Sequence, residues 1–246
     1  MSESVGCSIG VVCEGPSDLN LLHPLVDQVI LRVPWIEDEV LDSFRKYRGF
    51  RSDEPFLAWS HIRQLKREHR VVFRGNLTGL PSHRDALRTR EAIALLTLHS
   101  PQPVDAILIF RDGDKEFSER KKAIQQARKL HGSRIPVIVG IANCMREAWL
   151  LCGFEPIGQE QELLDQECTR IGFDPRTRTH LLQASDGTAD QSPKRILSVL
   201  TAGSQSRECC CISECSLDLL RSRGDQNGLR EFIEEVELRL LPVFSR

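Results

Sequence analysis

Acidic residues stand at three places in the chain, each shortly after a run of apolar residues typical of a buried strand. Two follow the first such run, two follow the clearest run in the middle of the chain, and one comes after the last run. In an open parallel sheet the functional crevice lies at the carboxyl ends of the strands, so we expect side chains that follow different strands to meet there. The five candidates are Glu14, Asp18, Asp112, Asp114 and Glu147.

The spacing within each pair allows both carboxylates to face the same space. Asp18 lies one helical turn after Glu14, while Asp112 and Asp114 alternate at i, i+2 on an extended segment. Five carboxylates that converge without basic partners would repel one another, and divalent cations would compensate their charge. Because every donor is an oxygen, Mg²⁺ or Mn²⁺ is favoured over zinc.

Each acidic motif also has a structural interpretation when it is taken alone. Asp-Gly-Asp is common in turns, and Glu-Gly-x-x-Asp can begin a helix with a capping acid. The combination of the motifs, in order and each at the end of a strand, favours the metal site.

The elements that must position these residues alternate along the chain. Apolar, β-branched runs predict strands at 8–13, 70–73, 104–110 and 134–141. Amphipathic patterns predict helices from Ser17 or Asp18 to about Val33, from about Phe56 to Leu65, over 82–99 and over 116–130. This alternation predicts an α/β fold with a parallel sheet flanked by helices.

Two further segments complete the expected organisation. Residues 34–70 are predicted to be a helical insertion, because Pro34, a mixed charge run and Pro55 precede an amphipathic helix. After Glu147 the strand patterns fade, and residues 156–246 are predicted to be mostly helical. We therefore expect a catalytic α/β domain at 1–155 and a helical C-terminal region at 156–246.

Composition sets the broad class of the protein. Of 246 residues, 40% are hydrophobic and 28% charged, as in ordinary globular proteins. No apolar run reaches the length of about 20 residues that a membrane helix needs, and the N-terminal residues lack the pattern of a signal peptide. The nine cysteines include no CxxC motif. We therefore expect a cytoplasmic protein with reduced cysteines and no membrane partner.

Other residues with chemical potential are weaker candidates. Cys209, Cys210, Cys211 and Cys215 are close in sequence, but their spacing matches no familiar zinc module, and buried helical cysteines are the favoured interpretation. His83 follows a turn-rich segment and could reach the site or cap a helix. No Ser-His-Asp arrangement and no GxxxxGK[ST] loop is visible.

Charge is unevenly distributed along the chain. The formal net charge is −2, yet residues 41–90 carry twelve Lys or Arg and five Asp or Glu, a local net of +7. Such a block can follow a phosphate backbone, and the alternative is a solvated helical face. The candidate nucleic-acid-binding residues are Arg63, Lys66, Arg67, Arg70 and Arg74.

The acidic motifs resemble those of a known family. The strand followed by Glu14-Gly-x-x-Asp18, with a later strand followed by Asp112-x-Asp114, resembles the Toprim fold of topoisomerases, primases and overcoming-lysogenization-defect (OLD) nucleases. The element Arg146-Glu147-Ala-Trp149-Leu-Leu is similar to the glutamate-tryptophan-leucine pattern of stand-alone Toprim proteins of the DUF4276 type. The resemblance covers about residues 8–151 and extends loosely to Pro193-Lys194 and to the helix at 228–232. The segment between Asp18 and Asp112 is longer than a minimal Toprim core requires.

The resemblance implies an activity and a partner. Glu14, Asp18, Asp112 and Asp114 would be metal ligands, Glu147 would complete a second metal site, and Lys194 could offset developing charge. The expected activity is Mg²⁺- or Mn²⁺-dependent endonucleolytic hydrolysis of DNA with two ions. An SMC/ABC-type ATPase would be the partner chain of a two-component antiphage defence system.

Two alternatives remain open. The first is a non-catalytic Toprim subunit that regulates an ATPase complex. The second is a haloacid-dehalogenase-like phosphatase, since that family also places Asp-x-Asp after a strand. The nucleophile of that family ends the first strand, where this chain has Glu14.

Overall fold

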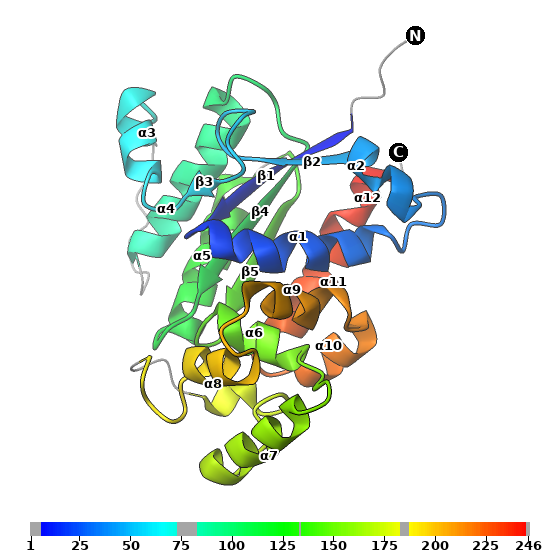
Figure 1. Cartoon of the computed structure of the whole chain (residues 1–246). Helices are drawn as coiled ribbons and strands as arrows, with labels where there is room; N and C mark the ends of the chain where they lie inside the picture. Colours follow the sequence, from blue (N-terminus) through cyan, green and yellow to red (C-terminus); the bar gives the residue numbers. More distant parts are fainter. Residues whose placement is uncertain (1–5, 73–82, 133, 183–186, 245–246) are drawn as a thin grey trace.

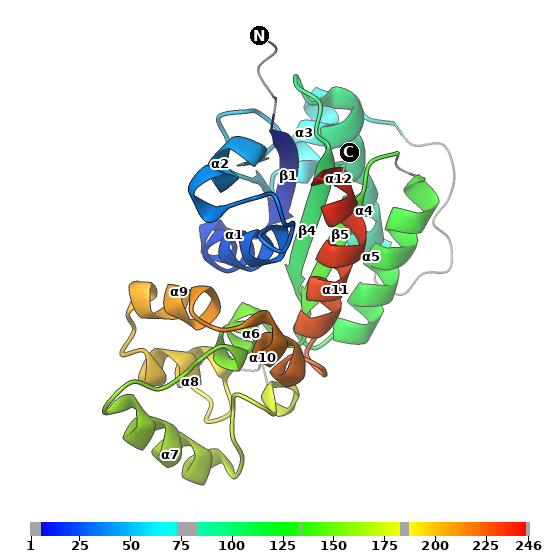
Figure 2. The same ribbon diagram turned by 90° about the vertical axis from the view of Figure 1, so that its right-hand side faces the viewer.

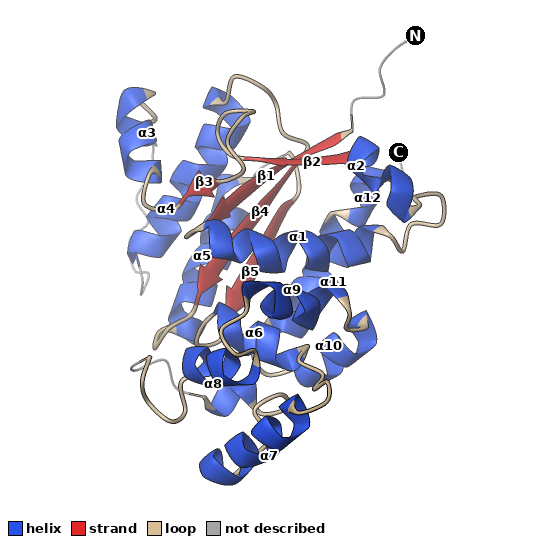
Figure 3. Cartoon of the chain, in the orientation of Figure 1, coloured by secondary structure: helices blue, strands red, loops and turns tan. Residues whose placement is uncertain are grey.

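The computed structural model describes residues 6–72, 83–132, 134–182 and 187–244, and a parallel β-sheet lies at its centre (Figures 1 and 3). The strands are β1 (Cys7–Cys13), β2 (Arg45–Arg48), β3 (Leu57–Ala58), β4 (Ala106–Asp112) and β5 (Val137–Ala142). Their order is β2-β1-β4-β5, and β3 pairs with the end of β1 beyond β2. The predicted α/β class with a parallel sheet is confirmed.

Helices cover both faces of the sheet and make up the C-terminal region, as expected. The first half of the described chain contains α1 (Pro16–Ile30), α2 (Leu41–Phe44), α3 (Ile62–Glu68), α4 (His83–Ala94), which continues as a π-helical turn at Leu95–His99, and α5 (Phe117–His131). The second half contains α6 (Arg146–Cys152), α7 (Glu160–Ile171), α8 (Pro193–Leu200), α9 (Gln205–Ser213), α10 (Leu217–Arg223), α11 (Leu229–Arg239) and α12 (Leu241–Phe244). Short 3-10 turns lie at Asp38–Val40 and Thr179–Leu181.

Alternation along the strands divides the core between the two faces of the sheet. On β4, Leu108 and Phe110 face the cluster that includes α1 and α11, while Ile107 and Ile109 face the cluster that includes α4 and α5. Successive side chains of a strand point to opposite faces, so a strand buried on both faces reads as a continuous apolar run. Figure 2 shows α1 on one side of the sheet and α4 and α5 on the other.

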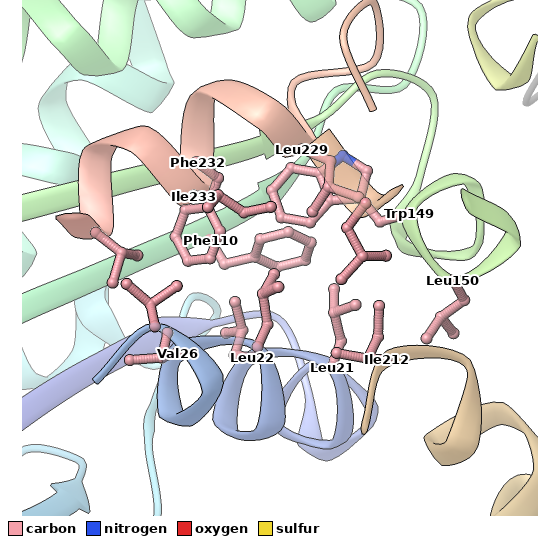
Figure 4. Close-up of a cluster of buried hydrophobic side chains, with 14 of the residues drawn as sticks. Leu21, Leu22, Val26, Phe110, Trp149, Leu150, Ile212, Leu229, Phe232 and Ile233 are labelled. Carbon is pink, nitrogen blue, oxygen red and sulfur yellow. The ribbon is translucent and has the colours of Figure 1, made fainter. Parts of the chain in front are cut away.

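The C-terminal helix α11 packs directly on the sheet. Trp149 of α6 lies between Phe110 and Phe232, with ring centroids 5.2 and 5.3 Å away (Figure 4). Gly140 of β5 makes room for Phe232, because a Cβ at this position would lie 2.7 Å from the Cδ2 atom of that ring. The Trp149 indole N–H donates to the backbone oxygen of Asn227 at 2.9 Å. The C-terminal region therefore shares one hydrophobic core with the α/β region.

Residues 34–70, predicted to be a helical insertion, are only partly helical. They also supply β2, which pairs in parallel with Cys7–Gly10, and β3, which pairs with the end of β1. The helix predicted from Phe56 begins only at Ile62, because Leu57 and Ala58 pair with β1 and residues 59–61 form a turn. The Trp59 N–H also donates to the Cys13 carbonyl at 2.8 Å.

The strand predicted at 70–73 is wrong over its described residues. Arg70 has a φ of 51° in the left-handed region, which ends the segment after α3, and Val71 and Val72 belong to no strand. Phe73 lies outside the described residues.

Candidate functional site

The five predicted carboxylates lie at the carboxyl edge of the sheet. Glu14 follows β1, Asp18 is in the first turn of α1, and Asp112 is the last residue of β4. Asp112 pairs with Ala142 of β5, and Asp114 forms an antiparallel bridge with Cys144 shortly before Glu147. The negative charges of Glu14, Glu147 and Asp18 all act on Asp112, and that of Asp114 acts on Glu14. The parallel strands thus bring the five side chains together.

Asp112 is the carboxylate whose pKa is most strongly perturbed in this group. Burial raises its pKa from 3.8 to about 7, and the neighbouring charges of Glu14, Glu147 and Asp18 act in the same direction. Its Oδ1 accepts a hydrogen bond from the backbone N–H of Arg146 at 2.7 Å, which ties the end of β4 to the start of α6. Among the five carboxylates, Asp112 is therefore the one that ionises least readily in the metal-free protein.

Asp18 has a structural role as well as its place in the cluster. Its side chain is buried, and its Oδ2 accepts from the backbone N–H groups of Glu14 and Gly15 at 2.9 and 3.1 Å. Burial raises the pKa of Asp18, while these two hydrogen bonds lower it. The alternative interpretation of Glu-Gly-x-x-Asp, a helix start with a capping acid, therefore holds for Asp18.

Arginines accompany the carboxylates, so divalent cations are not the sole possible compensation of their charge. Arg111 forms an ion pair with Glu14, and Arg120 lies 2.9 Å from Asp114. Arg146 lies 3.1 Å from Glu147. These partners come from neighbouring positions on β4, α5 and α6, where opposite charges on the same edge of the sheet meet.

Two of these arginines connect the cluster to residues that the sequence had not indicated. Arg120 also lies 3.0 Å from Asp85 of α4, and Arg146 lies 3.4 Å from Glu208 of α9. The guanidinium of Arg111 stacks over the Trp59 ring at 4.7 Å. Glu208 and Asp85 are far from the motifs in sequence, and no local pattern marks them. Only the packing of α9 and α4 reveals them.

The backbone is strained where β4 meets the segment after β5. Asp114 and Cys144 have φ angles of 47° and 73°, a region that non-glycine residues rarely occupy, and the Asp114 N–H donates to the Cys144 carbonyl at 2.8 Å. Between the two acids, a Cβ on Gly113 would lie 2.6 Å from the Ala142 carbonyl oxygen. Residues 112–114 therefore pass very close to residues 142–144, and this close approach fixes the positions of Asp112 and Asp114.

Cys144 is a further residue that the sequence had not indicated. Its thiol is buried beside the cluster, and burial together with the charges of Asp112, Asp114 and Glu147 raises its pKa to about 12. The thiol is therefore neutral at physiological pH.

The donor set at this edge fits a hard divalent cation by its chemistry. All five candidate ligands are carboxylates, and they face three arginines, two of which also pair with Asp85 and Glu208, so carboxyl groups outnumber guanidinium groups at this edge. In the side-chain positions of the described residues, no three His, Cys, Asp or Glu are grouped closely enough to hold a metal ion. Because the acids pair with arginines instead, ion binding requires some of these pairs to open.

The remaining candidates form none of the ion pairs of the cluster among the described residues. Lys194 is exposed at the start of α8 and makes no ion pair with any described residue. The His83 backbone begins α4. Cys211 and Cys215 are buried, and Cys209 and Cys210 are half-buried, in and just after α9.

The predicted nucleic-acid-binding residues do not share one environment. Arg63 and Arg67 of α3 and the following Arg70 are exposed or half-exposed. Lys66 lies 2.7 Å from the buried Glu91 of α4, so it holds α3 against α4. Arg74 lies outside the described residues.

A scan against protein families, a search of curated proteins and a search of solved structures found no match for this chain. Among the described helices, none combines the length and the apolar character needed to cross a membrane. The fold and the site thus define an α/β protein with an acidic, arginine-paired edge.

Proposed function

We propose that this protein is a Mg²⁺- or Mn²⁺-dependent endonuclease that hydrolyses phosphodiester bonds in DNA. The observation that carries the proposal is the surplus of carboxyl groups where five carboxylates meet three arginines at the carboxyl edge of the sheet. A partly buried charge excess of this kind is unfavourable unless a cation compensates it. The resemblance of the motifs to Toprim nucleases supports the same activity.

The residues have distinct places in this proposal. Glu14, Asp112 and Asp114 would hold one ion and Glu147 a second, with Asp18 fixing the turn that presents Glu14. Two such ions, when bound, supply Lewis-acid activation of water and stabilisation of the leaving oxygen. Arg111 and Arg120, released from their carboxylates, would contact the oxygens of the scissile phosphate. Lys194 belongs to the proposal through the resemblance alone.

The partner and the cellular role rest on the same resemblance. We include an SMC/ABC-type ATPase as the partner chain and a cytoplasmic antiphage defence system as the context. A pull-down of the tagged protein from its own host, followed by assay of the eluate for ATPase activity, tests this part.

The experiment that tests the activity is a cleavage assay with carboxylate variants. Supercoiled, linear and single-stranded DNA are incubated with Mg²⁺, Mn²⁺ or EDTA. We expect cleavage that EDTA abolishes, and a loss of about a hundredfold or more in Asp114→Asn and Glu147→Gln. The matched control is Asp218→Asn on α10, an exposed carboxylate away from the cluster. Cleavage that persists in EDTA, or wild-type rates in both site variants, would refute the proposal.

One observation favours a second function. The pairs of Glu14 with Arg111, Asp114 with Arg120 and Glu147 with Arg146 compensate three of the five carboxylates with cations of the chain itself. Such pairing is suited to a non-catalytic subunit that regulates an ATPase. A protein that stimulates or inhibits its partner's ATPase but cuts no DNA, with or without that partner, would establish this alternative. Hydrolysis of p-nitrophenyl phosphate, lost in Asp112→Asn, would instead indicate a haloacid-dehalogenase-like phosphatase.

A further inference from the structure

A basic cavity lies at the opposite end of the sheet from the carboxylates. It has a volume of about 940 Å³ and is formed by α5 from Lys122 onward, the segment leading into β5 and the end of α11. Its cationic lining consists of Lys122, Arg128, Lys129, Arg134 and Arg239, and no acidic residue is among the described residues that line it. The sequence analysis had placed basic character only in residues 41–90, so this surface is a product of the fold.

Most of the positive charge of this cavity is not neutralised. Glu235 of α11 pairs with Arg128 and lies 2.8 Å from Arg239, so one carboxylate serves two arginines. Across the described residues, Lys122, Lys129 and Arg134 form no ion pair. Five cations and one carboxylate leave an excess of four positive charges, in a chain whose formal net charge is −2. Such an excess attracts a polyanion.

The cations form a stripe rather than a single point. Lys122 and Lys129 are seven residues apart on α5, which is two turns of one helix face and about 10 Å. That length matches about three nucleotides of one strand along a duplex axis. Between the two lysines, the amide side chains of Gln125 and Gln126 line the same cavity and can donate hydrogen bonds.

A second cavity continues this surface towards α3. It has a volume of about 590 Å³ and shares Gly132, Arg134 and Ile135 with the first. Its lining adds Arg90 and His131 and reaches Val71, the neighbour of the exposed Arg70. The basic surface therefore continues from the first cavity to Arg90, and the second cavity, whose other lining is mostly apolar, ends at Val71.

We propose that the basic cavity binds the sugar-phosphate backbone of a nucleic acid at a distance from the carboxylate cluster. The extended, multi-cation form of the surface favours a chain of phosphates over a single small anion. The first residue of β5 lines the cavity and its last residue, Ala142, pairs with Asp112. Five steps along a strand measure about 16 Å, so the cavity contacts phosphates several nucleotides from the bond at the cluster.

This inference rests on the proposed function for the identity of the polyanion, and the test separates the two. Binding is measured by fluorescence anisotropy in EDTA, where no cleavage occurs, with single-stranded and duplex DNA of about 30 nucleotides and with a short oligonucleotide of about six. The cavity variant replaces three exposed cations that form no ion pair among the described residues: Lys122→Gln, Lys129→Gln and Arg134→Gln. The control variant removes the same charge from exposed cations outside the cavity and outside residues 41–90: Arg32→Gln, Arg178→Gln and Arg230→Gln.

We expect the cavity variant to lose about tenfold or more in affinity for the long DNA and to reduce the slope of log K against log salt by about two to three. The control variant should change both quantities little. The short oligonucleotide, bound near the cluster, should lose little affinity in either variant. A charge-conserving variant, with Lys122→Arg, Lys129→Arg and Arg134→Lys, should restore binding, which excludes misfolding as the cause.

Three results would overturn the proposal. Equal losses of DNA affinity in the cavity and control variants would show that only the overall charge of the protein matters. Equal losses of affinity for the long and the short DNA in the cavity variant would show that the cavity does not bind DNA separately from the carboxylate cluster. Binding of ATP that the cavity variant loses, together with unchanged DNA affinity, would assign the surface to a free nucleotide instead. If the protein shows no Mg²⁺-dependent cleavage but the cavity variant binds DNA more weakly as expected, the nuclease proposal is refuted and the inference about the cavity is supported.

Discussion

Replacing Asp112 by asparagine should stabilise the metal-free protein above neutral pH. Burial and the charges of Glu14, Glu147 and Asp18 make the ionised form of Asp112 unfavourable and raise its pKa to about 7. An asparagine side chain at this position removes the charge at nearly the same volume. Its amide oxygen can still accept from the backbone N–H of Arg146, which donates to Asp112 at 2.7 Å. The substitution thus removes repulsion without removing the hydrogen bond.

The magnitude and the pH window follow from the two pKa values. Below about pH 4 the Asp112 carboxyl is protonated in both the unfolded and the folded chain, so it costs no stability. Between about pH 4 and pH 7 the unfolded chain releases the proton while the folded protein keeps it, and stability falls as pH rises. A rise from 3.8 to about 7 corresponds to at most about 4 kcal/mol above pH 7. Because Asp112 is partly accessible to water, we expect on the order of 2 kcal/mol.

Urea unfolding in EDTA at several pH values between 4 and 8 (about one unit apart) measures this effect. The free energy of unfolding of Asp112→Asn should exceed that of wild type by an amount that is small near pH 4, grows to about pH 7 and is then constant. At pH 8 the midpoint should rise by about 1 M urea. Saturating Mg²⁺ should stabilise wild type more than the variant, because bound ion favours ionised Asp112. A difference in unfolding free energy that does not change with pH, or a variant less stable than wild type at pH 8, would refute this reasoning.

Two other substitutions test the surroundings of the site and the packing of the C-terminal region. Arg111→Gln removes the cation that competes for Glu14, so Mg²⁺ affinity by titration calorimetry should rise by about threefold to tenfold. Weaker binding would show that Arg111 instead positions Glu14, and Arg32→Gln, at a distant pair, is the control. Gly140→Ala places a Cβ 2.7 Å from the Phe232 ring and should destabilise the protein by about 1–3 kcal/mol in urea unfolding. Gly187→Ala, where a Cβ meets nothing within 4 Å, should change stability by less than about 0.5 kcal/mol, and equal effects of the two would refute the packing argument.

The central strands could be predicted from the sequence because burial on both faces requires continuous apolar runs. The runs predicted at 8–13, 104–110 and 134–141 overlap β1, β4 and β5, with boundaries shifted by at most three residues. The edge strands β2 and β3 could not be predicted. The residues of β2 are Arg-Lys-Tyr-Arg, and its buried Arg48 is satisfied by Ser8 and Ser100 and by backbone carbonyls. Such distant partners leave no periodic pattern in the sequence.

The candidate site was predictable to the extent that it depends on strand topology. Residues that follow parallel strands reach the same edge whatever the helices between them do, which is why the carboxylates meet. The arginine pairs depend instead on side-chain packing between α4, α5 and α9, and the sequence marks only Arg111 and Arg146 by adjacency to an acid. The basic cavity likewise requires α5 and α11 to be neighbours across β5, and these helices are about a hundred residues apart.

The arginines explain how an acidic edge of this kind can fold before any ion arrives. Without them, the five carboxylates would lie together in a partly buried place, and their repulsion would oppose closure of the sheet edge. In each of the three pairs the guanidinium also has a second partner. Trp59 stacks on Arg111, Asp85 pairs with Arg120, and Glu208 pairs with Arg146. A guanidinium with a second partner can separate from its carboxylate and still keep one favourable contact. The same contacts that make the metal-free edge stable therefore make its ion pairs exchangeable, and exchange is what a cation, or a phosphate, at this edge would require.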